Sequence, residues 1–238
     1  MKKNIILLIV ILLSIQTFSQ DVNSFFSRTD DFFKEHVSLG KVDYSSIYSN
    51  QDSLNELMRL AEEITIFKED SNIYQAFWIN AYNLSVIKGI IDNYPIKSPL
   101  NKAGFFDRIT YSLAGKKITL NGIEHKLLRA QFNDTRFHFV LVCGAIGCPP
   151  LISEAYFPNS LDEQLSRQTR LALNGDYFIK IDTKKKRIKG SEIMKWYKED
   201  FTMNGTSEID FINKYRKNAI PNNYKLSYFQ YNWNLNKQ

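Results

Sequence analysis

The sequence predicts a single α+β domain with a central sheet and a buried helix. Three observations indicate this class: a long, almost wholly apolar helical segment at residues 71–91, several short strand-like segments, and no regular strand–helix–strand alternation. Of the 238 residues, 44% are hydrophobic and 14% aromatic, which is enough for a substantial core. We expect this one domain to cover residues 20–238.

The first 19 residues have the pattern of a secretory signal peptide. Lys2 and Lys3 precede an apolar run at residues 5–13, and small residues follow near Ser19. The run is shorter than the roughly 20 residues that a membrane helix needs. We therefore expect cleavage, no stable membrane span after processing, and a periplasmic or secreted protein in which disulfides are permitted.

The charge of the chain is mildly basic. The formal net charge is +6, from 31 Lys and Arg against 25 Asp and Glu, and removal of Lys2 and Lys3 leaves +4 (29 − 25). This excess is too small and too scattered to indicate a nucleic-acid partner. The run at residues 184–186 reads as a solvated turn. We expect a small molecule, a peptide or a cell-envelope component as partner, and no cofactor, since no P-loop or dinucleotide fingerprint is present.

The first elements are helical. Two helices are expected within residues 21–63, and the strongest helix signal covers residues 71–91. Its middle is apolar almost all round, which predicts a buried helix. Asn80 and Asn83 share one face of it, and a buried amide without partners costs about 1–3 kcal/mol. The favoured interpretation is that both amides tie neighbouring loops to the helix, and the alternative is that one of them orients a catalytic or substrate group.

The next elements are short. A hairpin is expected at residues 111–120, followed by a helix at 123–129 that carries Glu124, His125 and Arg129. Glu124 and His125 are adjacent and point about 100° apart, so they do not form the zinc pair of an HExxH helix. Later expected elements are a helix at 160–173, a hairpin at 177–189, short helices at 193–201 and 209–215, and an extended tail at 228–236.

Between these elements lies the segment RFHFVLVCGAIGCPPL, residues 136–151. Apolar side chains at alternate positions on both faces predict a buried strand at residues 137–142. Cys143 ends this strand, and the glycines and prolines that follow form a turn that also holds Cys148. Reactive groups often lie where a scaffold element ends in a loop.

The leading hypothesis is a thiol-dependent hydrolase or transferase. Cys143 would be the nucleophile and His125 its base, with Glu124 or Asn80 orienting the imidazole. His138 is less suitable as the base, because an extended strand would place it about 16 Å from Cys143. The residues expected to bind substrate or to form structural polar contacts are Asn83, Arg129, Arg136, His138 and Cys148. Papain-like and transglutaminase-like hydrolases use similar groups, but place the cysteine at the start of the buried helix.

Three other interpretations stay open. A Cys143–Cys148 disulfide would fit an exported protein, and the chain would then be a non-enzymatic binding or structural module of the cell envelope. The same pair could instead act in thiol redox chemistry, although its spacing is not CxxC. A metal site made of His125, Glu124 and the two cysteines matches no standard zinc spacing, so no metal is expected.

Several motifs in fixed order resemble the DUF547 family. They are FWINAYN at 77–83, NGIEHKLLR at 121–129, the segment at 136–151, WYKEDF at 196–201 and the aromatic tail ending in NWNLN. The resemblance covers about residues 40–236 and implies an identity without an established activity. The family pattern has Tyr-Asp-Trp-Ser-Leu-Asn in the tail, and Asn232 stands here in place of the aspartate.

Overall fold

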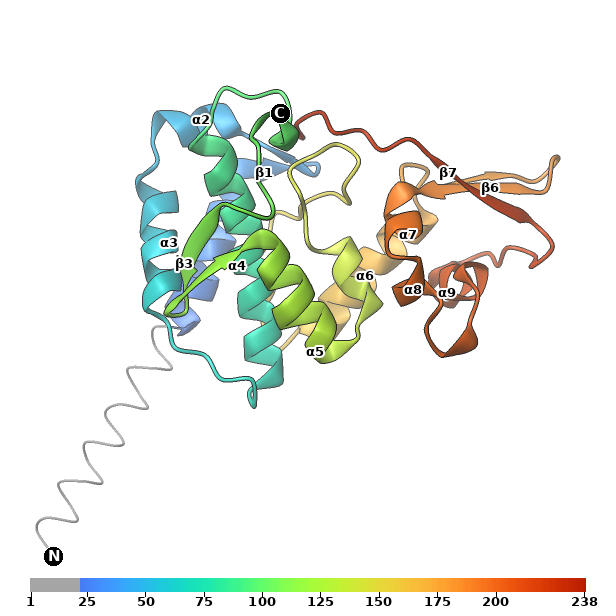
Figure 1. The fold of residues 1–238 in the computed structure, drawn as a ribbon, viewed down its shortest axis with the longest axis horizontal. Helices are drawn as coiled ribbons and strands as arrows, with labels where there is room; N and C mark the ends of the chain where they lie inside the picture. Colours follow the sequence, from blue (N-terminus) through green and yellow to red (C-terminus); the bar gives the residue numbers. More distant parts are fainter. Residues whose placement is uncertain (1–21) are drawn as a thin grey trace, which may run out of the picture.

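The computed structural model describes residues 22–238, and these form a mixture of helices and small sheets (Figure 1). The predicted α+β class is confirmed. The predicted signal peptide lies outside the described residues. Within the part of the chain that is described, no helix is long and apolar enough to cross a membrane.

The first helix described covers residues 22–36. The α-helices that follow are α2 (Tyr44–Ser49), α3 (Asp52–Glu63), α4 (Ser71–Ile91), α5 (Ala130–Phe132), α6 (Leu161–Asn174), α7 (Glu192–Trp196), α8 (Lys198–Phe201) and α9 (Glu208–Tyr215). Shorter 3₁₀ segments are η1 (Pro99–Asn101), η3 (Thr135–Phe139) and η4 (Met203–Gly205), and η2 (Gly122–Arg129) is π-helical. The helices predicted at residues 71–91 and 160–173 are thereby confirmed.

Helix α4 is the centre of the fold. Of its 21 residues, 17 are buried, so it is covered on nearly every side. It packs against α2, α3 and η2, and Figure 1 shows it enclosed by these elements. A helix with apolar residues on all faces has no polar face to present to water. It is therefore most stable in the core, where this segment lies.

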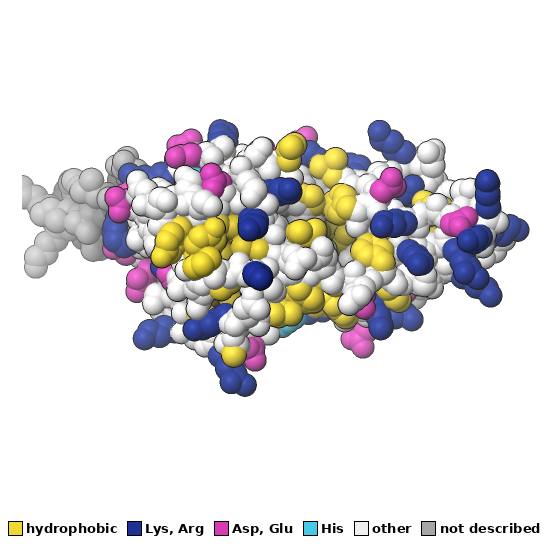
Figure 2. All heavy atoms as spheres, turned by 90° about the horizontal axis from the view of Figure 1, so that it is seen from above, with side chains coloured by type: hydrophobic (Ala, Val, Ile, Leu, Met, Phe, Trp, Pro, Cys, Tyr) yellow, Lys and Arg dark blue, Asp and Glu magenta, His cyan; other side chains and the backbone are white. Residues whose placement is uncertain are grey.

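Within residues 22–238 the strands form three small sheets rather than one central sheet. The strands are β1 (Val37–Ser38), β2 (Lys41–Val42), β3 (Thr110–Leu113), β4 (Lys116–Thr119), β5 (Ile179–Asp182), β6 (Arg187–Ser191) and β7 (Lys225–Phe229). Pairs β1–β2, β3–β4 and β5–β6 are antiparallel, while β7 joins β6 in parallel. Both predicted hairpins are present, and the lysine run at residues 184–186 is exposed at the basic end of the molecule (Figure 2).

The buried strand predicted at residues 137–142 is wrong. Residues 135–139 form η3, which begins where the Asp134 carboxylate accepts from the Arg136 N–H at 2.9 Å. Beyond it, the Asn83 side chain donates to Val140 O at 3.0 Å and accepts from Val142 N at 2.9 Å. The amide thus takes the backbone groups that a neighbouring strand would have bonded. An apolar run without polar alternation is compatible with either structure.

The loop that holds both cysteines, residues 143–150, is called the cysteine loop, and its backbone is hydrogen-bonded to the C-terminal tail. Ile146 N donates to Asn234 O and Gly147 N to Asn232 O, each at 2.8 Å. A Cβ on Gly147 would lie 2.8 Å from the Tyr231 ring, so only glycine allows this close approach. The predicted extended tail therefore packs on the core, and it brings Tyr231 against the cysteines.

Candidate functional site

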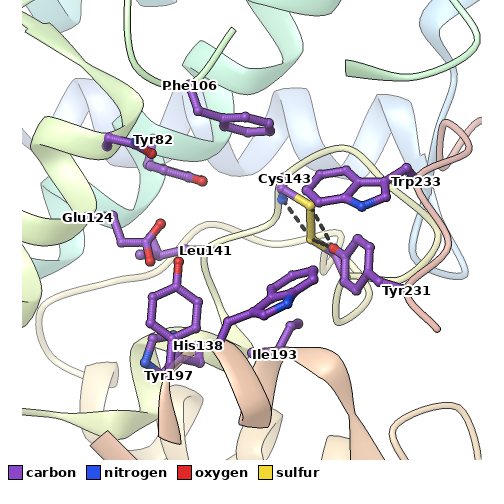
Figure 3. A pocket seen from close by; sticks show the side chains of 13 residues that line it. Tyr82, Phe106, Glu124, His138, Leu141, Cys143, Ile193, Tyr197, Tyr231 and Trp233 are labelled. Atoms are coloured by element: carbon purple, nitrogen blue, oxygen red, sulfur yellow. Dashed lines mark hydrogen bonds between the residues drawn. A yellow bond between two sulfur atoms is a disulfide. The ribbon is translucent and has the colours of Figure 1, made fainter. Parts of the chain in front are cut away.

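A cavity of about 310 Å³ lies between segments that are distant in sequence. We call it the aromatic pocket (Figure 3). Its lining comes from α4, the loop before β3, η2, η3, the cysteine loop, α7 with the residue that follows it, and the tail. The lining residues are Tyr82, Phe106, Asn121, Glu124, His138, Leu141, Cys143, Cys148, Ile193, Trp196, Tyr197, Tyr231 and Trp233.

One wall consists of three packed rings from α7 and the tail. The Trp196 and Trp233 rings are nearly parallel, at 21°, with centroids 6.0 Å apart. The Tyr231 ring lies 4.9 Å from Trp196 and 4.6 Å from Trp233. Trp196 is 46% exposed, which places part of this wall in contact with solvent. Large rings in such contacts present rigid apolar surface to a ligand.

Glu124 supplies a carboxylate to this apolar lining. It is 8% exposed, and Figure 3 shows the Tyr197 hydroxyl directed at it. Burial, followed by the charge of Glu124, raises the pKa of Tyr82, Tyr197 and Tyr231 above that of an ordinary tyrosine. These three hydroxyls keep their protons at neutral pH, and the Glu124 carboxylate is the source of a negative potential that reaches all of them.

A cluster of charged and polar side chains contacts His138 and Tyr197, which line the pocket. Asp200 accepts from His138 Nε2 at 2.7 Å and from Arg129 at 2.7 and 3.0 Å. The Tyr197 ring contacts both side chains, 4.1 Å from the His138 ring and 4.6 Å from the Arg129 guanidinium. Burial alone would raise the pKa of Asp200, but the hydrogen bonds from His138 and Arg129 hold it well below its ordinary value. The cluster fixes the positions of His138 and Tyr197.

Cys143 and Cys148 form a disulfide with their Cα atoms 6.3 Å apart. Both cysteines line the aromatic pocket. The Tyr231 hydroxyl lies 2.9 Å from each sulfur, and the Cys143 N–H donates to the Cys148 sulfur at 2.9 Å. The disulfide therefore forms part of the lining of the aromatic pocket.

The family of the central region follows from a comparison with known families. Residues 68–171 match the DUF547 family, described as a protein of unknown function. The match supports the predicted DUF547 resemblance over these residues, which include Glu124, His138 and both cysteines, while the wider extent of about residues 40–236 stays a prediction. No curated protein and no solved structure matches the chain. The wall formed by α7 and the tail lies C-terminal to the matched DUF547 residues.

Within the DUF547 region the predicted site residues separate into two groups. Cys143, Cys148, Glu124 and His138 line the aromatic pocket together. His125 is not part of the lining: its side chain is 40% exposed, and its Nδ1 lies 2.7 Å from Arg129 Nη1. The separation of about 16 Å expected between His138 and Cys143 assumed an extended strand. This assumption is wrong, because residues 135–139 form η3. Cys143 as a nucleophile stays a prediction, and it requires a reduced disulfide.

Asn80 and Asn83 tie loops to α4, as the favoured interpretation of these amides predicts. Asn80 donates to Tyr156 O at 2.8 Å and accepts from Tyr156 N at 3.0 Å, while Asn83 holds the segment that leads to Cys143. Arg136 is bound by Asp134 and by Asp162, the latter at 2.7 Å. None of these three side chains lines the aromatic pocket.

Sequence reasoning did not identify the aromatic wall or Asp200. The signals were the density of rings in the tail at 228–236 and the carboxylate of Asp200 four residues after Trp196. Asn232, at the tail position where the resemblance implies an aspartate, is exposed and accepts from Asn234 N at 3.0 Å. An aspartate would make the same local bond, so this position acts as a turn cap. Among the described residues, no three His, Cys, Asp or Glu side chains are grouped to hold a metal ion.

Proposed function

We propose that this chain is an exported DUF547 protein whose aromatic pocket binds a small organic cation. The observation that carries this proposal is the Glu124 carboxylate, 8% exposed, among the rings of Tyr82, Tyr197 and Tyr231. A cation over an aromatic face gains about 0.5–2 kcal/mol, and more where water is excluded. A carboxylate in the same cavity adds direct charge pairing.

The size and composition of the pocket agree with this class of ligand. At about 310 Å³ it lies at the lower end of the range for small-molecule sites, roughly 300–1,000 Å³. Apolar rings dominate the lining, and the polar groups are few and fixed. The disulfide favours a binding module over the thiol-dependent enzyme, because a bridged Cys143 has no thiolate to attack a substrate.

Choline is a suitable probe, since its quaternary ammonium group cannot donate a hydrogen bond and its neutral isostere is 3,3-dimethylbutan-1-ol. We expect the protein to bind choline more tightly than the isostere. Glu124→Gln should weaken choline binding at least about fivefold, the equivalent of about 1 kcal/mol, and leave the isostere unchanged. Titration calorimetry measures both affinities.

Glu208→Gln is the matched control. Glu208 is also a buried glutamate, but it bonds the Tyr228 hydroxyl and does not line the pocket. Its choline affinity should equal that of the wild type. Equal binding of choline and the isostere, or an unchanged choline affinity in Glu124→Gln, would refute the proposed cation site.

Export is a separate part of the proposal. It is supported by Lys2, Lys3 and the apolar run at residues 5–13. We expect the mature protein from its native cell to begin within a few residues of Gln20 and to occur in the periplasm or the medium. N-terminal mass spectrometry after cell fractionation measures both. An intact Met1 on cytosolic protein would contradict export.

A further inference from the structure

The two sulfurs of the disulfide have unequal surroundings. Cys148 is 6% exposed, and its sulfur accepts from both the Cys143 N–H and the Tyr231 hydroxyl, each at 2.9 Å. Among residues 22–238, the Cys143 sulfur has only the shared Tyr231 hydroxyl as a donor, and Cys143 is half-buried at the pocket surface. The bridge is therefore asymmetric in hydrogen bonding as well as in access.

This asymmetry matters for thiol–disulfide exchange. A thiolate attacks one sulfur, and the other leaves as a thiolate, so the reaction is faster where the leaving thiolate is better stabilised. Hydrogen bonds to an ionised acceptor are stronger than those to a neutral one. The two donors at Cys148 therefore gain strength as negative charge develops on its sulfur. Tyr231 remains a donor at neutral pH, because burial and Glu124 raise the pKa of its hydroxyl.

We propose that the Cys143–Cys148 disulfide oxidises small thiols that enter the aromatic pocket, with Cys143 as the attacked sulfur and Cys148 as the leaving group. A substrate thiolate forms a bond to the Cys143 sulfur, and the electron pair of the broken bond passes to the Cys148 sulfur. A second substrate thiolate then attacks the substrate sulfur of this mixed disulfide and releases Cys143. The net reaction converts two thiols and the protein disulfide into one small disulfide and the protein dithiol.

The charge of the pocket selects among thiols, and this selection rests on the proposed cation site. Glu124 lines the same cavity as the two sulfurs. An aminothiol places its ammonium group near this carboxylate, whereas a carboxylate-bearing thiol meets repulsion. The expected substrate class is therefore an aminothiol.

The direct test identifies the sulfur that is attacked. Oxidised protein is mixed with cysteamine at neutral pH, free thiols are alkylated at once, and the peptide that holds both cysteines is fragmented by mass spectrometry. We expect the cysteamine adduct on Cys143 and the alkyl group on Cys148. An adduct on Cys148, or a bridge that reacts only after denaturant is added, would overturn the proposal.

Tyrosine variants test the role of the hydroxyl. Tyr231→Phe should slow the reaction with cysteamine about three- to tenfold, because it removes one donor from the leaving sulfur. Tyr228→Phe is the matched control, since the Tyr228 hydroxyl bonds Glu208 away from the pocket lining. Its rate should be that of the wild type. Equal rates in the two variants would overturn the assignment of Tyr231.

A variant that lacks the disulfide gives an independent measurement. In Cys143→Ser the backbone N–H and the Tyr231 hydroxyl remain at Cys148 and lower the pKa of its thiol, whereas burial and the Glu124 carboxylate raise it. Alkylation rate against pH measures this value, and the additional change Tyr231→Phe should raise it. A Cys148 pKa that is the same with and without the Tyr231 hydroxyl would contradict the leaving-group role.

Charge selection is measured separately. After correction for thiolate concentration, the wild type should react faster with cysteamine than with mercaptoacetate, and Glu124→Gln should remove this preference while the adduct stays on Cys143. A missing preference would refute the cation site alone. Missing exchange would refute the disulfide activity alone.

Discussion

Replacement of Asn83 by leucine is expected to lower the free energy of unfolding by about 2–4 kcal/mol. Asn83 is 1% exposed, and its side chain is the hydrogen-bond partner of Val140 O and Val142 N. Leucine would leave both backbone groups buried and unsatisfied, at about 1–3 kcal/mol each, with partial compensation from its apolar surface. Denaturant melts monitored by circular dichroism measure the change.

Asn55→Leu is the matched control for this substitution. Asn55 also lies in a helix, α3, but it is exposed. Its leucine variant should remain within about 0.5 kcal/mol of the wild type. Asn80→Leu should lower the free energy of unfolding by a similar amount to Asn83→Leu, because it leaves the N–H and C=O of Tyr156 without their partner. An unchanged melting midpoint in Asn83→Leu would mean that its amide does not hold the loop.

Replacement of Asp200 by asparagine is expected to cost about 2–3 kcal/mol at pH 7, and the cost should disappear in acid. Asp200 is the shared partner of His138 and Arg129, and removal of its charge leaves the partly buried Arg129 guanidinium without its counter-ion and His138 Nε2 without its carboxylate partner. Because the folded state lowers the pKa of Asp200, its contribution to stability is complete above the unfolded pKa of about 3.9. It is lost as the pH falls below that value.

The measurement is the difference in unfolding free energy between wild type and Asp200→Asn at several values of pH. The difference should shrink below about pH 4. Asp107→Asn, a change at an exposed carboxylate, should show a small difference at every pH. A gap between wild type and Asp200→Asn that widens in acid would contradict the charge cluster.

The helical part of the fold could be predicted because its signals are local. Helix α4 begins and ends at the predicted residues, since an apolar run of that length on every face of a helix is only compatible with a buried position. The strand predicted at residues 137–142 was wrong because the structure of this run is not determined by local signals. Whether that run becomes a strand depends on what bonds its backbone, and here the partner is the side chain of Asn83, more than 50 residues away in the chain.

The candidate site could be predicted only in part. Both cysteines, Glu124 and His138 were identified because reactive side chains in an apolar context are conspicuous in the sequence. The choice of His125 over His138 depended on the extended geometry expected before Cys143. The aromatic wall was not identified, because the sequence alone does not show that the tail returns to the cysteine loop. Tyr231 reaches the sulfurs only through that tertiary contact.

A crystal structure of the wild-type protein grown in saturating choline is the most direct test of the proposed cation site. The ammonium group is expected beside the Glu124 carboxylate, among the rings of Tyr82, Tyr197 and Tyr231. An aromatic pocket that stays empty under these conditions would contradict the proposal. Choline bound elsewhere, with no contact to Glu124, would contradict it equally.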